Sequence, residues 1–140
     1  MNSSTSWLLA ATASVLLWSS ASPAANLDAR LVGEWRGQRD PEGQCSFLAW
    51  KMIRLADGKF EVAFYIDAGR TKETLREKGS WWVKGNEFFT QTQGVATSDG
   101  YAYSFVDADT VHFTVLKRDP SADCQADYQF SDHRVTGARK

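Results

Sequence analysis

The sequence predicts an all-β fold, a single antiparallel up-and-down β-barrel of about eight strands that follows a signal peptide. Three observations predict it. Short segments alternate apolar and polar residues, turn signals such as Asp-Gly separate these segments at regular intervals, and no segment carries a long helical stripe. Because tight turns join most neighbouring segments, the pattern favours a meander over a Greek key. Closing the meander into a barrel would remove exposed strand edges.

Residues 1–25 are predicted to be a secretory signal peptide, and residues 26–140 to form the one folded domain. An uncharged apolar block at 7–18 is followed by small residues up to Ala24 and Ala25, where a signal peptidase would cleave. The alternative is a membrane anchor, but the block has about a dozen residues and a span needs ~20. We therefore expect a periplasmic or secreted protein without a stable membrane anchor.

The clearest strand of the domain is 59–67, in which Phe60, Val62 and Phe64 share one face after the turn Asp57-Gly58. The charged segment 71–78 is interpreted as a strand extension or a loop. The predicted strands are 33–36, 45–55, 59–67, 79–83, 87–93, 101–105, 110–116 and 126–130.

Composition excludes several function classes. The formal net charge of -1 lacks the basic excess that a nucleic-acid partner would require. The histidines, His112 and His133, are predicted at the surface with no nucleophile-elbow motif beside them, so we expect no enzyme and no catalytic residues. The aspartates fall at predicted turns, where their backbone hydrogen bonding explains them. We therefore expect neither a metal nor a cofactor.

Cys45 and Cys124 are the only cysteines, and they lie near the two ends of the domain. In an exported protein such a pair predicts a disulfide. The alternatives are two buried thiols or a metal-binding pair, and the latter lacks the additional ligands of a zinc site.

A short motif at the start of the first predicted strand, Gly33-Glu34-Trp35, resembles the Gly-x-Trp signature of lipocalins and lipocalin-like domains. The resemblance implies that Trp35 closes the base of the barrel and that a late arginine, here Arg134, packs over it as a cation–π partner. Gly79-Ser80-Trp81 repeats the motif. The chain lacks a late Thr-Asp-Tyr motif, and it is most similar to the small bacterial lipocalin-like (calycin-like) domains.

Aromatic residues dominate the predicted interior. An eight-stranded barrel is only just wide enough for side chains or for one small ligand. The sequence is therefore compatible with either a filled core or a ligand cavity. Any cavity should lie away from Trp35. The ligand-binding residues expected there are Phe64, Trp81, Tyr103 and Phe113.

Two functions follow from this barrel. The first, implied by the resemblance, is binding of a small hydrophobic molecule. The second is a protein inhibitor or adaptor that binds an exported protein partner through its surface, as bacterial metalloprotease inhibitors of similar outline do. It would use the segment 26–28, the loops, or exposed Trp50 and Trp82, unless other parts of the chain cover these rings. The volume of an internal cavity discriminates between the two.

Overall fold

The computed structural model describes residues 26–43, 45–125 and 127–136. The predicted signal peptide, residues 1–25, lies outside the described residues, as do Ala126 at the start of the predicted last strand and residues 137–140. In these described ranges, no helix combines the length and the apolar character needed to cross a bilayer.

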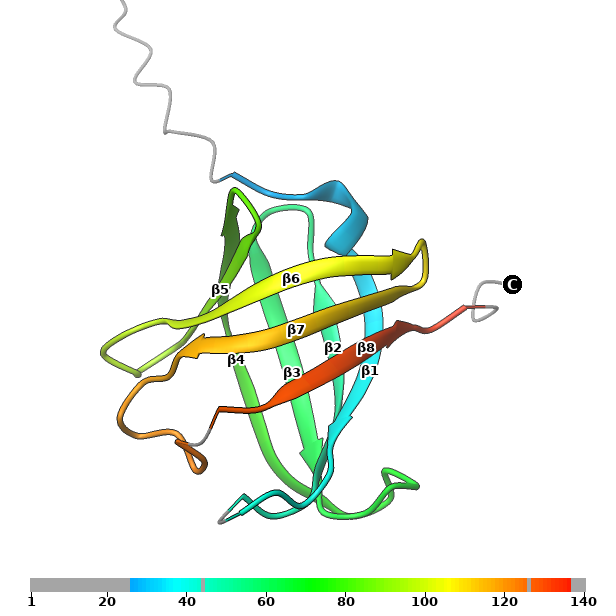
Figure 1. The fold of residues 1–140 in the computed structure, drawn as a ribbon, viewed down its shortest axis with the longest axis vertical. Coiled ribbons are helices and arrows are strands. Elements are labelled where there is room, and N and C mark those ends of the chain that lie inside the picture. Colours follow the sequence, from blue (N-terminus) through cyan, green and yellow to red (C-terminus); the bar gives the residue numbers. More distant parts are fainter. Residues whose placement is uncertain (1–25, 44, 126, 137–140) are drawn as a thin grey trace, which may run out of the picture.

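Eight antiparallel strands form a closed barrel in which each strand pairs with its neighbours in sequence and the last pairs with the first (Figure 1). This confirms the predicted all-β, up-and-down architecture. One short 3-10 helix, η1 (Ala29–Leu31), precedes the strands. They are β1 (Gly33–Arg39), β2 (Leu48–Arg54), β3 (Lys59–Tyr65), β4 (Glu73–Lys84), β5 (Glu87–Thr92), β6 (Asp99–Asp107), β7 (Thr110–Lys117) and β8 (Gln129–Arg134).

Burial alternates along the strands as their sequence pattern predicts. In β7, Val111 and Phe113 are buried inside the barrel, whereas His112 between them lies outside and contacts side chains of β8. The segment 71–78 extends β4 as a strand from Glu73. The last strand begins later than predicted, at Gln129, and Asp127 and Tyr128 before it lie outside the strand.

The end of the barrel next to η1 is plugged, and we call it the closed end. Buried Trp35 donates from its indole nitrogen to the carbonyl of Leu31 over 2.9 Å. The guanidinium carbon of Arg134 lies 4.3 Å from the centroid of the Trp35 ring, and its Nη1 donates to Val32 over 2.9 Å. Gly33 has φ +126°, and a Cβ there would lie 3.0 Å from Arg134. The Gly-x-Trp segment and Arg134 therefore form one packed unit.

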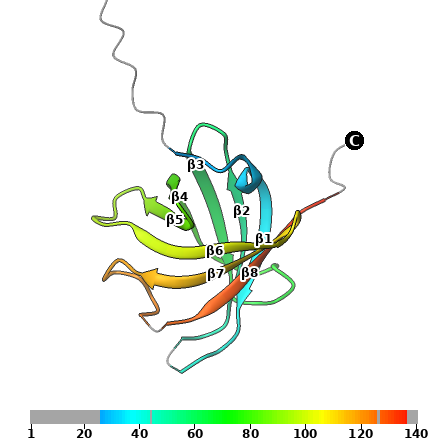
Figure 2. The same cartoon turned by 45° about the horizontal axis from the view of Figure 1, so that its top comes forward.

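The opposite end is the open end, where the loop between β1 and β2 meets the loop between β7 and β8 (Figures 1 and 2). The disulfide Cys45–Cys124 joins these two loops, and this confirms the predicted pairing. The two cysteines are 79 residues apart in the chain, and each is 3% exposed. The bridge ties the described loop residues 118–125 to the loop between β1 and β2.

Candidate ligand-binding cavity

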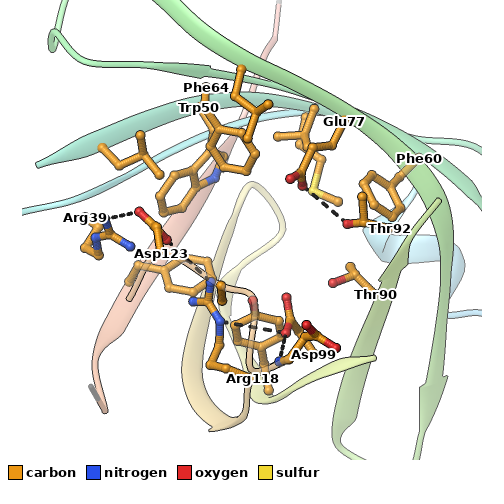
Figure 3. Close-up of a pocket in the computed structure, with 18 of the residues that line it drawn as sticks. Arg39, Trp50, Phe60, Phe64, Glu77, Thr90, Thr92, Asp99, Arg118 and Asp123 are labelled. Carbon is orange, nitrogen blue, oxygen red and sulfur yellow. Dashed lines mark hydrogen bonds and ion pairs between the residues drawn. The ribbon is translucent and has the colours of Figure 1, made fainter. Parts of the chain in front are cut away.

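A cavity of about 390 Å³ occupies the half of the barrel nearest the open end. All eight strands contribute residues to its wall, and the segment between β7 and β8 adds further lining residues, among them Arg118 and Asp123 (Figure 3). Trp35 is not among the lining residues, so the interior is filled at the closed end and hollow towards the open end. This is the location expected for a cavity from the sequence.

One side of the cavity is an apolar wall formed by β2, β3 and β8. The Trp50 ring packs edge-on against Phe130 and Phe64, with centroids 5.0 and 6.4 Å away. Met52 and Phe60 continue the wall. The expectation that Trp50 is an exposed contact residue is therefore wrong. Trp50 is 7% exposed and points inward, because it lies two residues before buried Met52 and shares its face of β2, while Lys51 between them is exposed.

The floor of the cavity carries an ion pair between Arg54 of β2 and Asp132 of β8, each 1% exposed. Asp132 also accepts a 2.8 Å hydrogen bond from the indole nitrogen of Trp50. The guanidinium carbon of Arg54 lies 5.0–5.5 Å from the ring centroids of Trp35, Phe88 and Phe113. Burial lowers the pKa of Arg54, but the adjacent carboxylate and the aromatic faces favour its charged form. The pair is neutral as a unit.

The mouth of the cavity carries further ion pairs. Arg39 donates to Asp123 over 3.0 Å, and Arg118 lies 3.8 Å from Asp99. Arg118 also donates to the hydroxyl of Tyr128. These contacts tie residues 118–123 to β1 and β6, and they pair both mouth arginines with carboxylates (Figure 3).

Glu77 of β4 differs from the other carboxylates of the cavity. Its side chain points into the cavity beside Thr92, whose hydroxyl donates to it over 3.3 Å (Figure 3). Within the part of the chain that the structure describes, no basic side chain lies within 4.0 Å of its oxygens. Burial raises the pKa of Glu77, and the nearby carboxylate of Asp99 adds to this effect.

The residues predicted from the sequence to bind a ligand separate into two pairs. Phe64 and Phe113 line the cavity. Trp81 is 1% exposed and donates to the carbonyl of Leu55 outside the cavity, in the filled half of the barrel. Tyr103 donates to Asp28 over 2.9 Å beside the closed end, and burial together with this bond raises the pKa of Tyr103 to about 12. Trp81 and Tyr103 face the barrel interior, but they lie nearer to the closed end than the cavity does.

Sequence reasoning missed the polar residues of the cavity. The alternation that places Trp50 and Met52 inside also places Arg54 inside, and the same spacing places Asp132 with Phe130. The alternation of inward and outward residues along each strand was thus the sequence signal that could have placed Arg54 and Asp132 inside the barrel. A charged residue in an inward position is unusual, since burying a charge requires a partner. The partner of Arg54 comes from a strand that is distant in the sequence.

Comparison with models of protein families yields no match, and comparison with curated protein sequences yields none either. The class of the protein is therefore defined by its structure, a small closed antiparallel β-barrel with one cavity-bearing end and one disulfide.

Proposed function

We propose that this protein is an exported, lipocalin-like binding protein that holds one small, mainly apolar molecule inside its barrel. The observation that carries the proposal is the cavity of about 390 Å³. Ligand cavities typically have ~300–1,000 Å³, with apolar walls and a few polar groups that orient the ligand. The apolar wall around Trp50 and Phe64 and the isolated carboxylate of Glu77 fit this description.

The lipocalin-like assignment is supported by the plug at the closed end. Gly33, Trp35 and Arg134 pack together in the way that the Gly-x-Trp resemblance implies. Export is supported by the disulfide, because such bonds persist in oxidising compartments.

The test is binding of N-phenylnaphthylamine, a neutral apolar dye that fluoresces when water is excluded. Val62 lines the cavity, so Val62→Phe fills part of it, whereas Ile53→Phe places the same added ring on the outside of the adjacent strand. We expect saturable binding to the wild-type protein and to Ile53→Phe, and binding about tenfold weaker to Val62→Phe. Equal binding to the two variants would refute a ligand site in the barrel.

A second candidate function is recognition of an exported protein through the outer surface. Trp82 of β4 and Phe89 of β5 stack outside the barrel with ring centroids 5.6 Å apart, and both remain half-exposed. In contrast, the segment 26–28 is held against the barrel through the Asn26 carbonyl and the Asp28 carboxylate. If the surface binds a partner, Trp82→Ala should abolish its capture from exported protein fractions and leave dye binding unchanged.

A further inference from the structure

The charges that line the cavity are not balanced, and this imbalance indicates the chemistry of its ligand. Three arginines and five carboxylates belong to the lining. All three arginines are paired with carboxylates, namely Arg39 with Asp123, Arg54 with Asp132 and Arg118 with Asp99. Two carboxylates remain outside these pairs, those of Asp119 and Glu77.

Asp119 is satisfied by its own loop. Its two oxygens accept hydrogen bonds from the backbone N–H and hydroxyl groups of Thr97 and Ser121. These four donors hold the pKa of Asp119 below its ordinary value, with Ser121 contributing most. A carboxylate so fully bonded has little capacity left for a ligand.

Glu77 is the carboxylate left for a ligand. A half-buried carboxylate with one long hydrogen bond loses hydration without a compensating partner. Residues 73–77 of β4 pair with β3, whereas the strand pairing of β5 with β4 begins at Gly79. Glu77 therefore lies in the part of β4 that pairs with one strand, and its side chain lines the cavity.

We propose that the cavity takes a small organic cation, a protonated amine on an apolar body the size of one or two rings, whose ammonium group pairs with Glu77. The inference rests on the proposed function and names the class of its ligand. The apolar body would lie against Trp50, Phe64 and Phe60, whose faces also attract a cation. An apolar carboxylate would instead enter a cavity whose lining carries five carboxylates against three arginines, and so would meet an excess of negative charge.

Three probes with the same body test this proposal by calorimetric titration at pH 7: naphthylmethylamine, naphthylmethanol and naphthoate. We expect the amine to bind about 10- to 100-fold more tightly than the alcohol, and naphthoate to bind most weakly. In Glu77→Gln, which keeps size and polarity, the amine should bind no better than the alcohol. Glu73→Gln, which removes an exposed carboxylate of the same strand, should leave all three affinities unchanged.

Two outcomes would overturn the inference: equal affinity of the amine and the alcohol for the wild-type protein, or an amine preference that survives in Glu77→Gln. If N-phenylnaphthylamine still binds and Val62→Phe weakens it, the proposed function stands and only the assignment of the ligand class fails. If neither the dye nor any naphthyl probe binds, the proposed function itself fails, and this inference with it.

Discussion

The guanidinium of Arg54 and the carboxylate of Asp132 form an ion pair enclosed by the barrel, between two strands that flank β1 on either side. The residues are 78 positions apart in the chain. A charge buried to this extent is tolerated only with its partner in place, because removing the partner leaves an uncompensated charge away from water. The pair therefore makes the registers of β2 and β8 depend on each other.

Asp132→Asn should destabilise the protein by about 3–5 kcal/mol, because it leaves the charge of Arg54 unpaired while the amide oxygen can still accept from Trp50. The double variant Arg54→Met/Asp132→Asn removes both charges and should recover most of this loss. Urea unfolding followed by circular dichroism measures both. If the double variant is as unstable as the single variant, the cost does not come from an unpaired charge.

Gly33→Ala should destabilise the closed end by about 2–4 kcal/mol, because φ is +126° and the new methyl group would press against Arg134. Gly85→Ala is the matched control. Gly85 also has a positive φ, +61°, but a Cβ there meets open space, so its cost should be about 1 kcal/mol. Thermal unfolding compares them, and equal losses would show that contact with Arg134 contributes nothing.

Removing the disulfide with Cys45→Ala/Cys124→Ala should cost about 4–5 kcal/mol, since the bridge closes a long loop in the unfolded chain. Dithiothreitol should lower the melting temperature of the wild-type protein and leave that of the double variant unchanged. A wild-type melting temperature that is insensitive to full reduction, verified by thiol titration, would contradict this expectation.

Stability should fall with acid through Asp119. Its folded-state pKa is depressed by hydrogen bonds from Ser121 and Thr97, so its contribution is present above the unfolded value of about 3.9 and is lost as the pH falls below it. Asp119→Asn should therefore unfold with a shallower pH dependence below about pH 4. Melting temperatures between neutral and acidic pH test this, and parallel curves for variant and wild type would refute it.

Glu77→Gln should make the unliganded protein slightly more stable at pH 7, by about 0.5 kcal/mol. The pKa of Glu77 is raised in the folded state, so its charged form costs stability above that pKa, and the cost vanishes as protonation completes at low pH. The advantage of the variant should thus disappear near pH 4. A destabilised variant at pH 7 would mean that the Glu77 charge is compensated in the folded protein.

The barrel could be predicted because alternation along the strands is a local pattern, and the disulfide because the chain has only two cysteines. Alternation tells which side of a strand faces inward, but not how far along the barrel a residue lies. That height depends on the stagger of all strands around the closed sheet. Trp81 and Tyr103 were therefore predicted to face inward correctly, yet they lie outside the cavity.

The polar residues of the cavity could not be predicted from the sequence in the same way. The partner of Arg54 lies on β8, and no local pattern links two residues so distant in the chain. Glu77 lies in a charged segment whose sequence does not distinguish an inward carboxylate from solvated neighbours such as Glu73 and Arg76. Its position follows only from the pairing of β4 with β3, opposite Val62.

The filled and the hollow halves of this barrel are maintained by different residues. The plug of Trp35 and Arg134 holds the closed end and contributes no lining residue to the cavity, and the disulfide holds the loops at the other end. Side chains around the opening, including Thr90, Thr92 and Glu77, can thus change during evolution at little risk to folding. Descendants of one such ancestor could diverge in what they recognise while inheriting the same scaffold.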